Sequence, residues 1–474
     1  MEPKYYAEPF RIKMVEPIKI LTAEERLEKI KEAHYNLFYL DSEDVYIDLL
    51  SDSGTGAMST AQWAGMMVGD EAYSGSRNYK RLVRTAQDIF GYKYIQPVHQ
   101  GRAAEKVVLP ILLGPGKYAI SNMHFDTTRA HVEIAGARAI DCVVPEALDT
   151  EVYSPFKGNM DLDKLEAAVK EHGSDKVAFV RMEAGTNLIG GQPFSLENLE
   201  QVRALCDRYG LILVLDASLL ADNLYFIKTR EEKCRHLSIK EITRRISDLC
   251  DILYFSGRKL GCARGGGLMT NNGEFNQKIS EFIPLYEGFL TYGGMSVREM
   301  EAITIGLEET MDMDMISQGP QFIAYMAEEL QNNGVPVVTP PGGLGCHIDA
   351  MQFVDHIPQT QYPAGALAAA LYIASGIRGM ERGTISEQRK PDGTEPLADM
   401  ELLRLALPRR VFTLSQVKYA VDRITWLYEN RRLIGGLKFV EEPETLRFFL
   451  GKLAPINAWQ EELAAKFKAD LGDF

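Results

Sequence analysis

Lys259 stands directly after a short apolar run, in a stretch rich in small residues. Residues 251–256 are Asp-Ile-Leu-Tyr-Phe-Ser, and glycines follow at positions 257, 261 and 265–267. A buried strand that ends in a small-residue turn delivers a side chain to the edge of a sheet, where α/β enzymes bind ligands. A lysine that is desolvated there loses its proton and becomes a nucleophilic amine. The alternative is an ordinary solvated lysine, because lysine is almost never buried without a partner.

An aspartate closes a second apolar run. Asp216 ends the stretch Leu-Ile-Leu-Val-Leu-Asp at residues 211–216. A carboxylate at the end of a buried strand needs a cation or a strong donor, although a role as a helix N-cap is an alternative. A lysine and an aspartate at neighbouring strand ends together indicate pyridoxal phosphate. The lysine then forms a Schiff base, and the carboxylate keeps the ring nitrogen protonated so that the ring withdraws electrons.

Other residues are suited to the phosphate and the ring of such a cofactor. Gly101 lets the backbone approach an anion, and Arg102 can donate charge-assisted hydrogen bonds. Ser256 and Arg258 are candidates to complete a phosphate cup. Phe125 follows another predicted strand, where it is placed to stack on a flat ring or to serve as an ordinary core aromatic.

The four residues from Ser256 to Lys259 also match S-x-x-K, the serine nucleophile motif of penicillin-binding enzymes. That chemistry also needs S-D-N and K-T-G motifs downstream, and its serine opens a helix. Neither motif follows here. Because both companion motifs are absent, we interpret Lys259, and not Ser256, as the reactive residue.

The elements that position these residues alternate between strands and helices, which predicts a largely parallel sheet covered on both faces. Helices are predicted over Thr22–His34, between Asp161 and Gly173, after Ser195, and across Ser296–Asn332. Strands are predicted at 117–121, 137–144, 176–182, 211–215 and 251–256. We expect an N-terminal arm with a first helix (1–58), a large domain (59–320), a smaller α/β domain (321–456) and a C-terminal extension (457–474).

Composition excludes several classes of function. The chain of 474 residues is 46% apolar and 25% charged, with a net charge of −14. Such an acidic protein lacks the basic surface that nucleic acid requires. No apolar run reaches the roughly 18 residues of a membrane span, and the start has no signal-peptide core. Six scattered cysteines without C-x-x-C pairs predict a reduced, cytoplasmic protein with no zinc site.

Taken together, these motifs resemble the tyrosine phenol-lyase and tryptophan indole-lyase (tryptophanase) family of pyridoxal-phosphate enzymes. The likeness extends from residue 7 to about residue 453. Its landmarks are Asp-Ser-Gly-Thr at 52–55, Gly-Asp-Glu-Ala-Tyr-Ser-Gly-Ser at 69–76, His-Gln-Gly-Arg at 99–102, Asn187 before Gly-Gly-Gln-Pro at 190–193, Tyr-Phe-Ile-Lys at 225–228, Tyr-Gly-Gly at 292–294 and Arg-Leu-Ala-Leu-Pro-Arg at 404–409.

The resemblance implies the aspartate aminotransferase fold (fold type I) and a homotetramer whose active sites are shared between subunits. It assigns Lys259 to the Schiff base, Asp216 to the ring nitrogen, Phe125 to stacking and Asn187 to the ring hydroxyl. The remaining cofactor contacts that it implies are Gln100, Gly101, Arg102, Ser218, Ser256 and Arg258.

The resemblance also implies the substrate contacts and the reaction. Arg404 matches the arginine that binds the substrate carboxylate, and Tyr73 matches the acid that protonates the leaving aromatic carbon. Arg382 matches the residue that holds a phenolic oxygen. The other side-chain contacts are Ser51, Phe38, Phe289, Phe448 and Phe449. The implied reaction is β-elimination, in which an aromatic amino acid is cleaved to pyruvate, ammonia and the released group.

Four positions depart from the phenol-lyase pattern. Asp126 replaces a threonine, as in the indole lyases, and Ser51 replaces a threonine near the substrate. Leu219 replaces an arginine beside the ring hydroxyl. Arg264 replaces an asparagine at the family's potassium site near Gly54 and Glu71, where we expect it either to pair with Glu71 in place of the metal or to point to solvent.

Because of these departures, several functions stay open beside tyrosine cleavage. They are tryptophan cleavage, β- or γ-elimination or β-substitution on another amino acid, and a non-catalytic role. A pair between Asp126 and Arg382 would favour a substrate other than a plain phenol.

Overall fold

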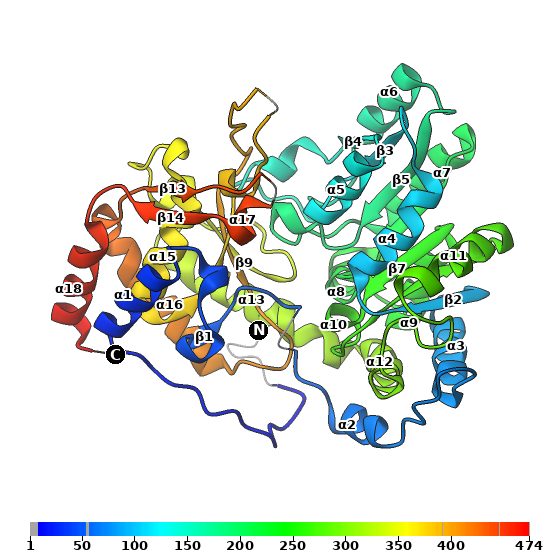
Figure 1. The fold of residues 1–474 in the computed structure, drawn as a ribbon, viewed down its shortest axis with the longest axis horizontal. Coiled ribbons are helices and arrows are strands. Elements are labelled where there is room, and N and C mark those ends of the chain that lie inside the picture. The colour runs from blue at the N-terminus through cyan, green and yellow to red at the C-terminus, as the bar shows by residue number, and fades with distance from the viewer. Residues whose placement is uncertain (1–7, 54–55, 391, 445, 474) are drawn as a thin grey trace. The chain divides into compact units, whose positions relative to one another are not determined.

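The computed structural model describes residues 8–53, 56–390, 392–444 and 446–473. The chain divides into two compact units (Figure 1). The central unit comprises Ser53–Asp149 and Tyr153–Pro320, and the terminal unit comprises Met1–Asp52, Thr150–Val152 and Gln321–Phe474. Among the described residues, no helix combines the length and apolar character that a membrane span requires.

The central unit is built on a seven-stranded sheet. Six strands run parallel and β8 runs antiparallel between β2 and β7. The order across the sheet is β2 (Tyr94–Val98), β8 (Gly266–Thr270), β7 (Ile252–Ser256), β6 (Leu213–Asp216), β5 (Val177–Glu183), β3 (Tyr118–Ser121) and β4 (Arg138–Asp141). The five strands predicted from sequence are β3 to β7, each close to its predicted bounds.

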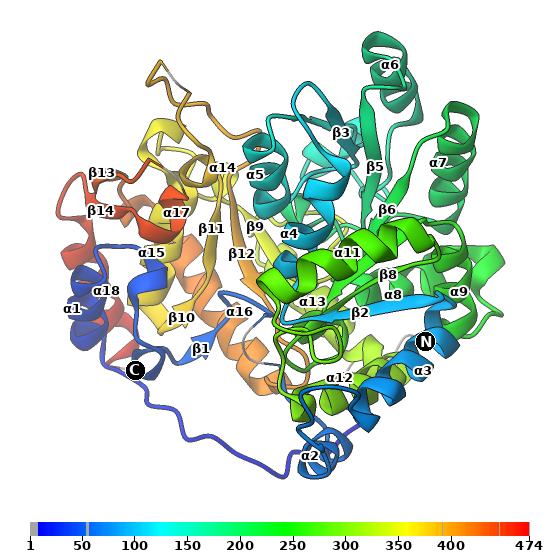
Figure 2. The same cartoon turned by 45° about the vertical axis from the view of Figure 1, so that its right-hand side comes forward.

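Helices cover both faces of this sheet, as the alternation of elements predicts. Figure 2 shows α4 (Gly101–Leu112) and α11 (Gly273–Tyr286), which pack together with α5 (Asp126–Ile134) on one face. The other face carries α3 (Arg77–Phe90), α6 (Leu162–His172), α7 (Leu196–Tyr209), α9 (Ile239–Asp248) and α12 (Val297–Thr310). The remaining helices of this unit are α2 (Thr60–Met67), α8 (Leu220–Arg230) and α10 (Gly257–Leu260).

Two features of this unit differ from the prediction. Gly266 and Gly267 lie in strand β8 and not in a turn, because their backbone passes so close to Phe255 that an added Cβ would lie 2.5 Å from its atoms. The long helix predicted across 296–332 is two helices, α12 and α13 (Met313–Asn332), separated at Met311 and Asp312.

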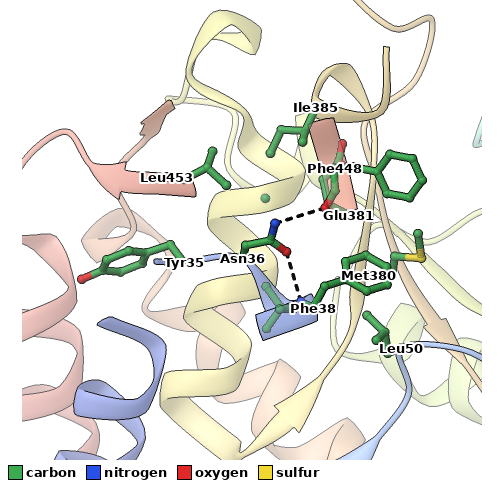
Figure 3. A pocket seen from close by; sticks show the side chains of 11 residues that line it. Tyr35, Asn36, Phe38, Leu50, Met380, Glu381, Ile385, Phe448 and Leu453 are labelled. Atoms are coloured by element: carbon green, nitrogen blue, oxygen red, sulfur yellow. Dashed lines mark hydrogen bonds between the residues drawn. The ribbon is translucent and has the colours of Figure 1, made fainter. Parts of the chain in front are cut away.

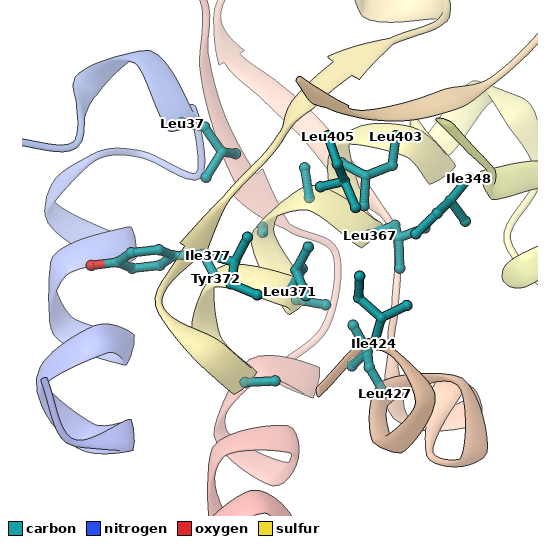
Figure 4. Close-up of a cluster of buried hydrophobic side chains, with 14 of the residues drawn as sticks. Leu37, Ile348, Leu367, Leu371, Tyr372, Ile377, Leu403, Leu405, Ile424 and Leu427 are labelled. Carbon is teal, nitrogen blue, oxygen red and sulfur yellow. The ribbon is translucent and has the colours of Figure 1, made fainter. Parts of the chain in front are cut away.

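The terminal unit surrounds the alanine-rich helix α15 (Pro363–Ser375), which is buried along its whole length. Around α15 lie α1 (Ala23–Glu32), α16 (Leu414–Glu429) and α18 (Trp459–Leu471), so the C-terminal stretch forms a packed helix. Figure 4 shows part of the core, to which Leu367 and Leu371 of α15 contribute.

Short strands complete the terminal unit. An antiparallel sheet has the order β11 (Met380–Arg382), β12 (Leu402–Ala406) and β9 (Gly345–Asp349). Two pairs accompany it: β1 (Ile47–Asp48) with β10 (Ile377–Arg378), and β13 (Leu437–Glu441) with β14 (Lys452–Pro455). The short helices are α14 (Ala350–Phe353) and α17 (Arg447–Leu450).

Candidate active site

The carboxyl ends of five central strands carry the predicted cofactor residues. Gln100 follows β2, Phe125 follows β3, Asn187 follows β5, Asp216 ends β6 and Lys259 follows β7. These five strands are parallel, so their carboxyl ends lie at one edge of the sheet. The fold therefore gathers residues that are far apart in sequence at the edge where α/β proteins bind ligands.

Lys259 lies in α10, a single helical turn that begins where β7 ends. The turn is tight because the Gly257 N–H donates to the Gly265 carbonyl at 2.6 Å, and a Cβ on Gly257 would lie 2.8 Å from that oxygen. The side chain of Lys259 is half-buried, and its Nζ lies 6.0 Å from the centre of the Phe125 ring. The structure therefore brings the candidate nucleophile and the candidate stacking residue together.

Asp216 is buried and its two carboxylate oxygens accept different donors. Oδ2 accepts a 2.6 Å hydrogen bond from Nη2 of Arg181 on the neighbouring strand β5, and Oδ1 accepts from the Ser218 N–H at 2.9 Å. The N-cap of the following helix α8 is Leu219, so Asp216 does not cap it. Arg181 was not predicted as a site residue, although a charged residue inside an otherwise apolar predicted strand was the available signal.

The residues predicted for the phosphate cup meet where α4 begins. Gln100 is the N-cap of α4, and a Cβ on Gly101 would lie 3.2 Å from the Cβ of Ser256. The Ser256 N–H donates to Oγ of Ser218 at 3.1 Å, so both serines are neighbours. Backbone N–H groups at a helix N-terminus and serine hydroxyls are donors that phosphate prefers.

Two arginines predicted for the cup differ in their surroundings. Arg102, in the first turn of α4, is exposed. Arg258 is half-buried and donates to the Ser53 carbonyl at 2.8 Å. Burial lowers the pKa of Arg258, and the positive charge of Arg264 lowers it further.

The residues predicted beside the ring hydroxyl are positioned by different parts of the central unit. Asn187 is buried in a short 3-10 turn (Asn187–Ile189), and its backbone N–H donates to Oε1 of Glu183 at 3.1 Å. Leu219 is buried and packs on Gly185, where a Cβ would lie 2.9 Å from the Cβ of Leu219. Asp126 is the first residue of α5, where a carboxylate stabilises the helix N-terminus.

This donor set fits pyridoxal phosphate. The α4 N-terminus with Ser218 and Ser256 suits the phosphate, Lys259 suits the aldehyde carbon, Asp216 suits the ring nitrogen, and Phe125 suits the ring face. Two structural observations support this fit. Lys259 lies close to the Phe125 ring, and Gly101 lets α4 begin close to Ser256.

Tyr73 lies in the loop between α2 and α3 and is 66% exposed. Its ring stacks on Phe289 with centroids 5.4 Å apart and meets Tyr292 edge-on at 5.2 Å. Desolvation, together with a hydrogen bond that the Tyr292 hydroxyl donates to Tyr73, raises the pKa of Tyr292. The predicted acid and the predicted substrate contact Phe289 thus form one aromatic cluster.

The predicted pair between Arg264 and Glu71 is wrong within this chain. Glu71 instead lies 3.3 Å from Nε of Arg298 and accepts hydrogen bonds from the Ser296 hydroxyl and the Arg298 N–H. Arg264 is 65% exposed and lies 3.6 Å from Glu299. Ser296 and Arg298 stand at the start of α12, so the helix end already satisfies Glu71. The other position predicted at this site, Gly54, lies outside the described residues.

The terminal unit assembles the predicted side-chain contacts into an aromatic wall. The rings of Phe448 and Phe449 lie 3.9 Å apart, and Phe38 lies 4.7 Å from Phe449. The guanidinium carbon of Arg382 lies 5.8 Å from the Phe448 ring centre, within cation–π range. Arg382 itself is buried at the end of β11.

Arg404 lies on the same face of the terminal sheet as Arg382. Met380 pairs with Arg404 and Arg382 pairs with Leu402 across β11 and β12, which places the two arginines on one face. Arg404 donates to the Leu50 carbonyl at 3.0 Å, next to Ser51. His347 pairs with Arg404 from β9, and burial together with the Arg404 charge lowers the pKa of His347 to about 3.

Comparison with known proteins identifies the family. The model of the β-eliminating lyase family matches residues 48–422. The chain belongs to this family. The tyrosine phenol-lyase of Symbiobacterium thermophilum is 44% identical over 95% of this chain and 99% of its own. The tryptophanase of Salinibacter ruber is 45% identical over 94% of this chain and 95% of its own. This β-eliminating lyase is therefore a pyridoxal-phosphate enzyme, as its sequence predicted.

Solved structures confirm the predicted fold. A threonine aldolase from Leishmania major is 14% identical with a TM-score of 0.57, covering 81% of this chain and 100% of its own. A serine palmitoyltransferase from Sphingomonas wittichii is 14% identical with a TM-score of 0.55, covering 82% of this chain and 88% of its own. Both likenesses concern the fold, which is the aspartate aminotransferase fold (fold type I).

Proposed function

We propose that this lyase cleaves the side chain of an aromatic L-amino acid, with tyrosine as the best candidate, and releases pyruvate and ammonia. The observation that carries the proposal is Arg382, whose guanidinium is buried beside the Phe38, Phe448 and Phe449 wall. A cation beside an aromatic wall suits a ring that ends in a hydroxyl. The tyrosine phenol-lyase relatives support the same substrate.

Each residue has a role in this proposal. Pyridoxal phosphate, when bound at Lys259, supplies the electron sink for the carbanion at the α-carbon. Arg404 binds the substrate carboxylate with its planar guanidinium, and the Lys259 amine removes the α-proton. Tyr73 gives a proton to the leaving ring carbon, and Arg382 binds the phenolic oxygen. General acid–base help of this kind contributes roughly 10²–10⁴-fold in rate.

A homotetramer with shared active sites belongs to the same proposal. Tyr73 is exposed in a single chain, although proton transfer to a substrate requires an enclosed position. A neighbouring subunit would supply that enclosure. We also propose a cytoplasmic location, which the six free and buried cysteines support.

A second candidate function is elimination or β-substitution on a different amino acid, including tryptophan. Asp126 and Leu219 favour it, because each changes the charge that the phenol-lyase pattern places beside the substrate or the ring. An ion pair between Asp126 and Arg382 would take the arginine away from a phenolic oxygen.

The decisive experiment is a screen of the purified enzyme with tyrosine, tryptophan and β-substituted alanines, with pyruvate release as the readout. Borohydride reduction and peptide mapping should first place the cofactor on Lys259. Arg382→Ala should then abolish tyrosine cleavage while leaving cleavage of β-chloroalanine largely intact. Tyrosine cleavage that survives this substitution would remove Arg382 from its assigned role.

A further inference from the structure

Arg181 is the centre of a buried polar cluster beneath the proposed cofactor site. Its side chain is fully buried on β5. Nε donates to the Tyr254 hydroxyl at 2.9 Å, Nη1 donates to Glu183 at 3.1 Å, and Nη2 donates to Asp216 at 2.6 Å. Nη1 also reaches Oγ of Ser121 and the Met123 carbonyl. A buried guanidinium needs such partners, since an unpaired charge is costly in the interior.

The strand register explains why these groups meet. Glu183 pairs with Asp216, and Asp216 pairs with Tyr254, so the three form one row across β5, β6 and β7. Side chains alternate along a strand, so Arg181, two residues before Glu183, points to the same face of the sheet. The neighbours Val180 and Met182 pack into the core on the other face.

The cluster joins two parts of the cofactor site. Asp216 is the residue placed for the ring nitrogen, and Glu183 holds the backbone of Asn187, the residue placed for the ring hydroxyl. Arg181 bonds both acids. The pKa of Glu183 is raised to about 7: burial is the largest cause, the Arg181 charge opposes the rise, and the Asp216 charge adds to it. The fixed positive charge of the cluster is therefore the guanidinium.

We propose that Arg181 is a positioning residue that weakens the hold of Asp216 on the ring-nitrogen proton of bound pyridoxal phosphate. One oxygen of Asp216 is already committed to a permanent cation at 2.6 Å. A second positive charge on the ring nitrogen would share the same carboxylate and feel repulsion from the guanidinium. The ring nitrogen consequently loses its proton at a lower pH than it would beside an aspartate without the arginine.

This inference rests on the proposed cofactor site and has its own readout. The holoenzyme is reconstituted with pyridoxal phosphate carrying ¹⁵N in the ring, and the ¹⁵N chemical shift is followed against pH. The first variant is Arg181→Lys, which keeps the positive charge but loses the planar guanidinium with its several donors. The second is the double variant Arg181→Met with Glu183→Gln, which removes the buried positive charge together with the carboxylate that pairs with it. Arg203→Lys is the matched control, because Arg203 bonds Asp251 before β7, at the other edge of the sheet.

The ring-nitrogen midpoint should rise by about one pH unit or more in the Met/Gln double variant, within the range for a neighbouring charge. Arg181→Lys should give a midpoint between those of the double variant and the unmodified enzyme, and Arg203→Lys should leave it unchanged. The charged and titratable groups that face this cluster stay in place in the lysine variant; they are Glu105, His124, Glu183, Asp216 and Tyr254.

The possible outcomes distinguish a failure of the role of Arg181 from a failure of the proposed cofactor site. An unchanged midpoint in the Met/Gln double variant, with the cofactor mapped to Lys259, overturns the role of Arg181 alone. If the double variant does not fold, Arg181→Gln, which removes the charge but keeps hydrogen-bonding groups, replaces it, and an unchanged midpoint there overturns the role in the same way. A cofactor mapped to another lysine, or to none, overturns the proposed cofactor site as well.

Discussion

Glu381 is expected to make the terminal unit less stable as the pH rises from about 4.5 to about 8. It lies on β11 between Met380 and Arg382, and its side chain points to the opposite face of the sheet from the two arginines. There it lines a pocket with Phe38, Leu50 and Phe448 (Figure 3). Oε2 accepts a hydrogen bond from Ser386 at 3.1 Å, whereas Oε1 has no hydrogen-bond partner among the described residues.

The magnitude follows from the shifted pKa. Burial, and secondly the Glu401 carboxylate, raises the pKa of Glu381 from 4.5 to about 8. The folded chain therefore binds this proton more tightly than the unfolded chain, and stability falls as the pH rises from about 4.5 to 8. The slope is at most about 1.4 kcal/mol per pH unit. His347 has the opposite sign, because its pKa is lowered to about 3 and its contribution is lost as the pH falls below 6.5.

The window between pH 6.5 and 8 consequently isolates Glu381 from His347. Glu381→Gln keeps the shape and the Ser386 contact but cannot ionise. Urea unfolding at both pH values should show the unmodified protein losing up to about 2 kcal/mol more than the variant across this window. Exposed Glu462→Gln is the matched control and should behave like the unmodified protein. Equal losses in the unmodified protein and Glu381→Gln would show that the buried carboxyl is not protonated at neutral pH.

Three further outcomes are expected of the active enzyme. Arg404→Lys should lower kcat/KM roughly 10–100-fold, mainly through KM, because an ammonium cannot bind a carboxylate with a two-pronged contact; an unchanged KM would contradict this. Mixing Tyr73→Phe with Lys259→Ala subunits should restore activity if active sites are shared, whereas inactivity of the mixture at all ratios would argue against sharing. Steady-state rates should be equal in potassium, sodium and lithium, because Arg298 already pairs with Glu71; strong activation by potassium would refute this.

The sequence predicted the elements whose signals are local. Strands β3 to β7 are buried apolar runs, and helices α6 and α7 carry their capping residues, Asp161 and Ser195, where the pattern placed them. Strand β8 escaped prediction because Gly266 and Gly267 are typical of turns, and only the close approach of Phe255 explains them. The break between α12 and α13 escaped because both helices are apolar on one side and no glycine or proline stands at residues 311 and 312.

The residues of the candidate site also fall into those with a local sequence signal and those without one. Lys259 and Asp216 were predicted from strand ends, because a parallel sheet brings such ends to one edge. Arg382 and Arg404 came only from resemblance, since the pairing of β11 with β12 depends on strands about 20 residues apart and not on any local pattern. The wrong partner for Glu71 has a similar cause: two arginines are available in sequence, and the start of α12 decides between them.

The charge balance around the cofactor site connects these findings. The resemblance places an arginine at position 219, on the hydroxyl side of the ring, where this chain has a buried leucine. The chain also carries a buried arginine at 181, which bonds Asp216, the acid proposed for the ring nitrogen. A positive charge on the hydroxyl side stabilises the ring oxyanion, whereas one behind Asp216 opposes protonation of the ring nitrogen. If Arg181 acts as proposed, the ring nitrogen is less protonated and the ring is a weaker electron sink, which gives more of the rate to the residues proposed to hold the substrate and its leaving group, Arg404, Arg382 and Tyr73.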